Sequence, residues 1–257
     1  MLLDISGGIA RVTLDRPEPG NVLSSAAALE LGSAVLRIAA DPSVRVVVLA
    51  ATGDIFCAGG DIREFVNAGE RLSQLIGDEL VHLNETLQRL YALPVPVVAA
   101  LKGPVAGGGI GLALTADIAL AADTVRFRSG YGAIGLSPDA GTSFFLTRIL
   151  GPKRAAEFLL SNRFIDAQEA LALGLVSRVV PISELESETE ALVRRLASGA
   201  PGAQAAVKAL VREAWTASHE SVLALERDFM IANAATPDSR EGVRAFLERR
   251  RPDFARA

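Results

Sequence analysis

Two glycine-rich passages in this sequence carry backbone N–H groups suited to binding an anion or an oxyanion. The first is FCAGGDI at residues 56–62, and the second covers residues 103–111. Each follows an apolar run typical of a buried strand and precedes a helical pattern. At the start of a helix the N–H groups are unpaired and the helix dipole is positive. The two passages therefore predict a backbone oxyanion site at the carboxyl ends of neighbouring strands.

The second passage does not match a nucleotide-binding loop. Counted from Gly107, the third glycine of a dinucleotide fingerprint falls on Leu112, and the sequence contains no phosphate loop of the Gly-Lys-Ser/Thr type. One glycine loop alone is equally well explained by tight packing of backbone against a strand. Two such loops at matching strand ends favour a binding site.

These loops need an α/β framework to position them, and the chain opens with a β-hairpin. Alternating residues on both sides of Gly7-Gly8 predict the two strands and their turn. Later apolar runs predict buried strands of a parallel sheet, and leucines at helical spacing predict a crossover helix between the first two. The predicted elements are a first helix ending near Asp41-Pro42, buried strands at 44–51, 95–101 and 118–122, the crossover helix at 72–90, and a last strand at 176–180.

Helical patterns dominate after residue 150. Pro152 suits a first helical turn, and three pairs of residues match helix-capping boxes, namely Asp166/Glu169, Ser183/Glu186 and Asp238/Glu241. Three more helices are predicted beyond Pro201, at residues 205–215, 219–234 and 239–249. We therefore expect a core over residues 1–199 and a C-terminal helical region over residues 200–257.

Composition excludes several classes of function. The chain has 257 residues, 50% of them hydrophobic, and 26 basic against 30 acidic side chains give a net charge of -4, which disfavours a nucleic-acid partner. The longest charge-free stretch, residues 103–116, is too short to cross a membrane, and the start lacks the basic residues of a signal peptide. A single cysteine, Cys57, and two histidines predict no disulfide and no zinc site. We expect a metal-free cytoplasmic protein in which Cys57 is a packing residue.

Several motifs occur in an order that resembles the crotonase, or enoyl-CoA hydratase/isomerase, superfamily over nearly the whole chain. The motifs are LDRP at 14–17 with Asn21, CAGGDI at 57–62, GGG at 107–109 leading to ADIALA at 116–121, and GLSPDAG at 135–141. The resemblance implies an α/β fold, a crotonase-like ββα spiral core with a C-terminal helical trimerisation region. It also implies an acyl-CoA thioester as substrate, no cofactor besides that coenzyme A, and a homotrimer or dimer of trimers.

The resemblance assigns the oxyanion hole to the backbone N–H groups of Gly60 and Gly108, in agreement with the glycine loops. Such preorganised donors stabilise the developing enolate of a thioester by roughly a hundredfold or more in rate. The two glutamates of the hydratases align here with Gly111 and Tyr131, neither of which is a carboxylate. Tyr131 is instead expected to line the acyl pocket.

Asp139 is the remaining candidate for the general acid–base. It matches the loop in which Δ3,Δ2-enoyl-CoA isomerases, and the ring-processing isomerases of phenylacetyl-CoA breakdown, carry their acidic base. One carboxylate is enough to move a proton from C2 to C4, whereas hydration must also position a water molecule. Apolar neighbours are expected to raise the pKa of Asp139. The alternative is that Asp139 only caps a helix beginning near Gly141.

Coenzyme A contacts are also carried over by resemblance. Ala58, Asp61 and Ile62 match the adenine-binding segment of the family, and Arg63 matches a basic position near the nucleotide. Phe246 and Arg249 match a pair in the terminal helix that covers this site, often from a neighbouring subunit. The alternative for these arginines is a solvated basic helix end.

The preferred function is therefore an acyl-CoA isomerase that shifts a double bond through a thioester enolate. One alternative is an enoyl-CoA hydratase of fatty-acid or aromatic-acid degradation, which would use Asp139 and a second group. Another is a non-catalytic acyl-CoA-binding scaffold. The same oxyanion hole would also serve other enolate chemistry.

Overall fold

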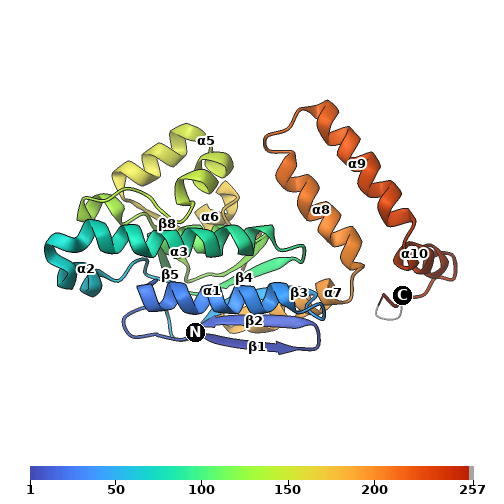
Figure 1. Ribbon diagram of the computed structural model, residues 1–257, viewed down its shortest axis with the longest axis horizontal. Coiled ribbons are helices and arrows are strands. Elements are labelled where there is room, and N and C mark those ends of the chain that lie inside the picture. The colour runs from blue at the N-terminus through green and yellow to red at the C-terminus, as the bar shows by residue number, and fades with distance from the viewer. Residues whose placement is uncertain (255–257) are drawn as a thin grey trace.

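The computed structural model describes residues 1–254, in which a six-stranded sheet forms the centre of the core (Figure 1). Its strand order is β1-β2-β3-β4-β6-β9, with β1 and β2 antiparallel and every later pair parallel. The hairpin and the parallel sheet expected from the sequence are thus confirmed. The strands are β1 (Leu2–Ser6), β2 (Ile9–Leu14), β3 (Val46–Ala51), β4 (Val97–Leu101), β6 (Ile118–Ala122) and β9 (Arg178–Val180).

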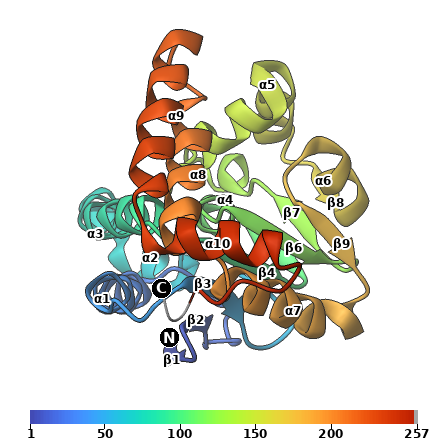
Figure 2. The same cartoon turned by 90° about the vertical axis from the view of Figure 1, so that its right-hand side faces the viewer.

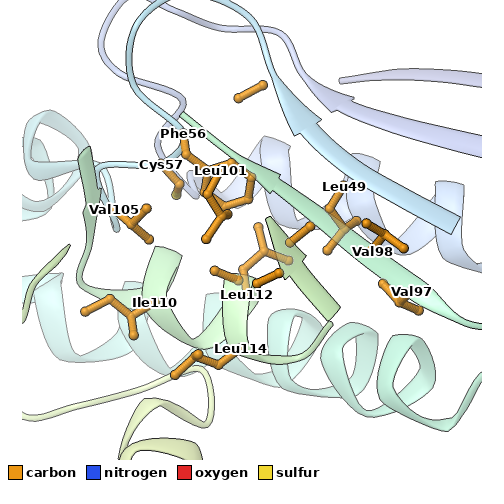
Figure 3. Packing of buried hydrophobic residues seen from close by; sticks show 14 of the residues in the cluster. Leu49, Phe56, Cys57, Val97, Val98, Leu101, Val105, Ile110, Leu112 and Leu114 are labelled. Atoms are coloured by element: carbon orange, nitrogen blue, oxygen red, sulfur yellow. The ribbon is translucent and has the colours of Figure 1, made fainter. Parts of the chain in front are cut away.

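The central strands are buried because helices cover both faces of the sheet. All five residues of β4 are buried, and Figure 3 shows Val97, Val98 and Leu101 packed among apolar side chains that include Leu112 of a neighbouring helix. Figure 2 shows α1 and α3 on one side of the sheet and α7 on the other. These helices are α1 (Ser25–Ala40), α3 (Leu72–Ala92) and α7 (Leu185–Ala197), with α2 (Ile62–Ala68) and the 3₁₀ turn η1 (Gly69–Arg71) before α3.

A small second sheet lies beside the glycine loops. It has the order β5-β7-β8 and is joined by short helices and by the longer helix α5. Gly151 breaks α5 with a non-helical φ of 76°, so that Pro152 starts a new first turn, as the sequence predicts. The elements of this part are β5 (Pro104–Ala106), α4 (Gly108–Leu114), β7 (Arg126–Arg128), the 3₁₀ turn η2 (Tyr131–Ile134), α5 (Thr142–Ser161), β8 (Phe164–Asp166) and α6 (Ala167–Leu173).

The last three helices project from the core (Figure 1). They are α8 (Pro201–Glu213), α9 (His219–Ala234) and α10 (Pro237–Leu247). Lys208 of α8 ties this region to the sheet, since its Nζ lies 2.6 Å from the Asp117 carboxylate and donates to the carbonyl of Val95 at 2.9 Å. Within residues 1–254, every helix is too short or too polar to span a bilayer.

Two of the predicted helix caps are wrong and one is confirmed. Asp166 caps α6 by accepting the N–H of Glu169 at 2.9 Å. Ser183 instead lies inside the 3₁₀ turn η3 (Ile182–Glu184), which delays the start of α7 to Leu185. Asp238 follows the true cap of α10, Thr236, because Pro237 takes the first helical position.

Candidate active site

The two glycine loops lie side by side at the carboxyl ends of β3 and β4. A parallel bridge joins Cys57 to Val105, and the N–H of Ala106 donates to the Cys57 carbonyl at 2.8 Å. Gly59, at φ 96°, allows this approach, since a Cβ there would lie 3.1 Å from the Ala106 carbonyl oxygen. The close contact between backbones places Gly60 and Gly108 on one cavity.

That cavity has a volume of about 380 Å³ and is lined by both glycines. Gly108 is the first residue of α4, so its N–H has no partner within the helix. Most of the wall around the glycines is apolar, which suits an acyl chain and excludes water from a developing oxyanion. The apolar side chains include Phe65 of α2, Ile76 and Leu80 of α3, and Ile134 and Leu136 of the η2 segment.

Asp139 and Tyr131 are two of the polar residues that line the same cavity, together with Arg128, Ser129 and Ser137. The Tyr131 hydroxyl donates to Oδ1 of Asp139 at 2.7 Å and lies 3.1 Å from Oγ1 of Thr142. Oδ1 is also 3.0 Å from the point where a Cβ on Gly108 would lie. A carboxylate therefore stands next to the predicted oxyanion hole, held in place by a phenol.

Burial and the Tyr131 hydrogen bond act in opposite directions on Asp139. Removal from water raises the pKa of the Asp139 carboxyl, while the donated hydrogen bond from Tyr131 lowers it, and burial is the larger effect. Burial and the nearby Asp139 charge raise the pKa of Tyr131, so the phenol remains a donor. The pair is suited to act as a base whose pKa is raised above that of a free aspartate, a property that favours a general acid–base.

The helix-cap alternative for Asp139 is not what the structure shows. The cap residue of α5 is Gly141, which has no side-chain cap bond. The backbone carbonyl of Asp139 accepts the N–H of Thr142 at 2.8 Å, while its carboxylate is bonded to Tyr131. The side chain is thus left on the cavity wall.

Gly111 lies in α4 beneath this loop and has no room for a side chain. A Cβ at Gly111 would lie 2.1 Å from the carbonyl oxygen of Ala140. A glutamate at this position, as in the two-glutamate hydratases, would require the Asp139 loop to move. The backbone therefore leaves no room for a carboxylate at Gly111, and Tyr131, the other position that resembles a hydratase glutamate, carries a phenol.

Six of the ten residues that the sequence singled out lie on the cavity, and four do not. Those on it are Ala58, Gly60, Ile62, Gly108, Tyr131 and Asp139. Asp61 caps α2 by accepting backbone N–H groups, and the side chain of Arg63 is exposed on the outside of that helix. Phe246 belongs to α10 and Arg249 follows that helix by two residues, and Figure 1 shows α10 and α2 at opposite ends of the molecule.

Cys57 is fully buried, and burial raises the pKa of its thiol to about 12. This agrees with the packing role expected for it, because a neutral buried thiol is a poor nucleophile. Over residues 1–254, no three His, Cys, Asp or Glu side chains cluster in a way that would hold a metal ion.

Sequence reasoning missed one carboxylate near the site, Glu79 of α3. Its side chain is only 7% exposed, on the helix face that carries the buried Leu83 and Leu87. The signal was present, because a glutamate three residues after Ile76 and four before Leu83 interrupts an apolar stripe. A charged residue on such a stripe needs a partner or a function.

Comparisons with known proteins agree over nearly the full chain. The model of the family described as enoyl-CoA hydratase/isomerase matches residues 4–257. A probable enoyl-CoA hydratase of Rhodobacter capsulatus is 39% identical, covering 98% of this chain and 96% of that protein. The trans-2-decenoyl-[acyl-carrier-protein] isomerase of Streptococcus mutans is 34% identical, covering 99% and 97%. The crystal structure of an enoyl-CoA hydratase/isomerase from Mycobacterium abscessus superposes with a TM-score of 0.94 at 35% identity, covering 98% of each chain.

Proposed function

This chain belongs to the enoyl-CoA hydratase/isomerase family, and on that premise we propose that it is an acyl-CoA isomerase with Asp139 as its general acid–base. The membership and the crotonase-like α/β fold predicted from the sequence are confirmed, and the chain is an enzyme of this family. The non-catalytic scaffold is therefore set aside. Within the family the finer question is which reaction the site performs.

A single carboxylate, Asp139, lines the cavity together with Gly60 and Gly108, while backbone fills the space beside Gly111. Proton transfer between two carbons of one substrate needs one acid–base group and an oxyanion hole. Addition of water needs a further group to hold and activate the water. The cavity as built supports the first reaction better.

The chemistry begins with the thioester carbonyl on the N–H groups of Gly60 and Gly108. The Asp139 carboxylate takes a proton from C2, and the electron pair of that C–H bond delocalises onto the carbonyl oxygen as a dienolate. Asp139 then returns the proton to C4, which moves the double bond from C3–C4 to C2–C3 and restores the Asp139 carboxylate, with no net change of atoms. Tyr131 holds Asp139 in position and stabilises its charged form.

The proposed substrate is an acyl-CoA thioester. Coenzyme A is part of this substrate, and the proposed reaction requires no separate cofactor. Its adenine would lie near Ala58, Asp61, Ile62 and Arg63, as in the family. Phe246 is 83% exposed and distant from the cavity of its own chain, which supports a contribution of the α10 pair from a neighbouring copy. A homotrimer or dimer of trimers would supply that neighbouring copy and is part of the proposal. We also propose that the protein acts in the cytoplasm.

An enoyl-CoA hydratase is the second candidate, favoured by the likeness to the probable enoyl-CoA hydratase of Rhodobacter capsulatus. A hydratase would need Asp139 together with another group that binds water. The two reactions start from different substrates and differ in product mass. They can therefore be separated in one experiment.

The test incubates the purified protein and its Asp139→Asn variant with a 3-enoyl-CoA and, separately, with a 2-enoyl-CoA. We expect the native protein to convert the 3-enoyl substrate into its 2-enoyl isomer without gain of mass. Loss of the acid–base should slow this by about 10²–10⁴-fold. Chromatography and mass spectrometry identify the products. If water is added to the 2-enoyl substrate while the 3-enoyl substrate does not react, the protein is a hydratase and the isomerase proposal is wrong.

A further inference from the structure

Thr142 is a buried residue whose hydroxyl joins a short chain of polar side chains in the candidate site. It is the first residue of α5 and is 0% exposed. Its Oγ1 atom lies 3.1 Å from the Tyr131 hydroxyl, which in turn donates to Oδ1 of Asp139 at 2.7 Å. The three groups come from the start of α5, from η2 and from the loop between them, and they form a connected chain that ends at the cavity wall.

The protons available in this chain determine the direction of each hydrogen bond. A phenol has one proton, and an ionised carboxylate can only accept. The Tyr131 proton is therefore used toward Asp139, so at the 3.1 Å contact the Thr142 hydroxyl is the donor. This hydroxyl makes no other hydrogen bond within residues 1–254, and no other acceptor competes for its proton.

Thr115 shows how another buried threonine hydroxyl of this chain is used. It directly follows α4 and is 2% exposed, and its Oγ1 atom donates to the Gly111 carbonyl of the preceding turn at 2.8 Å. Thr142 lies at the start of its helix, where no preceding helical turn offers a carbonyl. Its hydroxyl is therefore directed to the Tyr131 side chain instead of its own helix.

Building on the isomerase function proposed above, we propose that Thr142 is a positioning residue that acts on Asp139 through Tyr131. A phenol oxygen that accepts a hydrogen bond becomes a stronger donor, because hydrogen bonds in a chain polarise one another. The Thr142 hydroxyl thereby strengthens the Tyr131 bond to the Asp139 carboxylate and fixes the orientation of the phenol O–H. The backbone N–H of Thr142 holds the same loop, since it donates to the Asp139 carbonyl at 2.8 Å.

Removal of the hydroxyl should change the ionisation of Asp139 and leave substrate binding unchanged. Thr142→Val keeps the branched shape of the side chain and removes the donor. The pKa of Asp139 should rise, because the hydrogen bond that favours its ionised form is weakened. Turnover of a 3-enoyl-CoA at acid pH should fall by about threefold, since only part of one hydrogen bond is lost, and should recover at alkaline pH with little change in KM.

The experiment compares the pH–rate profiles of the native protein, Thr142→Val, Thr142→Ser and a control, Thr115→Val. Thr142→Ser retains the hydroxyl and should restore the native acid limb. Thr115→Val removes a buried hydroxyl that is bonded only to the Gly111 carbonyl, and it should keep the native acid limb. Thr142→Ala replaces Thr142→Val if thermal unfolding shows that Thr142→Val does not fold.

A second measurement follows the Asp139 carboxyl directly, by NMR titration of protein that contains isotope-labelled aspartate, with Asp139→Asn to assign the signal. The sharpest comparison is between Tyr131→Phe and the double variant Tyr131→Phe/Thr142→Val. Because Thr142 acts through the phenol oxygen, its removal should shift the pKa of Asp139 no further once that oxygen is absent.

The direct titration is needed because other ionisable groups surround Asp139. Burial, with a smaller contribution from the Asp139 charge, raises the pKa of the Cys57 thiol to about 12 and that of the Glu79 carboxyl to about 7. Arg128 lines the same cavity as a cation. A pH–rate profile alone would combine these ionisations, whereas the NMR signal belongs to Asp139.

Three results would overturn the inference. An unchanged Asp139 titration in folded Thr142→Val would show that the hydroxyl does not act on this carboxyl. An equal loss of turnover at every pH, in Thr142→Ser as well as in Thr142→Val, would show a packing role only. A further pKa shift when Thr142→Val is added to Tyr131→Phe would show an action that bypasses the phenol. If the native protein does not isomerise a 3-enoyl-CoA, the proposed function fails, while the NMR titration still decides whether Thr142 acts on Asp139.

Discussion

The cavity has two unlike walls, one made of backbone and one made of side chains. The backbone wall contains Gly60 and Gly108 at the ends of buried strands, where any residue offers the same N–H group. The side-chain wall contains Tyr131 and Asp139 in the segment between β7 and α5. The backbone wall can stabilise the oxyanion of any thioester enolate, whereas the side-chain wall determines which proton is moved. Substitutions should therefore affect the two walls differently.

The largest effect is expected where the two walls touch, at Gly111. In Gly111→Ala the new Cβ would lie 2.1 Å from the Ala140 carbonyl oxygen, so the adjacent Asp139 must shift. A displacement of about 1 Å costs about 100-fold in rate. We expect kcat to fall by at least that factor while circular dichroism remains native. Unchanged turnover would mean that the Asp139 loop is not fixed by α4. Gly132→Ala is the matched control, since a Cβ there meets no atom within 4 Å.

The second largest effect is expected from Asn21, whose side chain holds the segment that leads to Gly60 in the backbone wall. Asn21 is 1% exposed at φ 54°, accepts the Arg16 N–H at 2.8 Å, and donates to the carbonyls of Thr52 and Ile55 at 2.9 and 2.8 Å. Asn21→Ala leaves these buried groups unpaired, each at a cost of about 1–3 kcal/mol. We expect the free energy of unfolding to fall by about 2 kcal/mol or more in urea titrations. A loss below 0.5 kcal/mol would show that water replaces the side chain.

The smallest effect is expected from Tyr131→Phe, which keeps the ring and removes the donor to Asp139. Without that hydrogen bond the pKa of Asp139 should rise further. A base works in its ionised form, so turnover at acid pH, below the new pKa, should fall by about tenfold, roughly the effect of losing one hydrogen bond to a charged group. The acid limb of the pH–rate profile should move to higher pH, and turnover should recover at alkaline pH. A uniform loss at every pH would mean that Tyr131 acts by positioning alone.

Much of the fold followed from short-range patterns in the sequence. The β-branched runs predicted β3, β4 and β6 because a strand covered on both faces has no polar side, and the leucine spacing predicted α3. The patterns failed at Ser183 and Asp238, where a capping-box match lost to a 3₁₀ turn and to a proline at the first helical position. At both places two local signals for the start of a helix lie next to each other in the sequence. The conformation of the adjoining backbone determined at which residue the helix begins.

The chemical groups available could be read from the sequence: two glycine loops without phosphate-loop residues, one acidic candidate at Asp139, and no carboxylate at Gly111 or Tyr131. Which of these groups come into contact depends on the folded chain. The lack of space beside Gly111 and the burial of Glu79 depend on segments that are separated in the chain, and the Tyr131 bond to Asp139 depends on how the loop between β7 and α5 folds back on itself. Distances between such segments depend on sheet order and helix packing, and a carboxyl becomes an acid or a base only through the neighbours that this packing supplies.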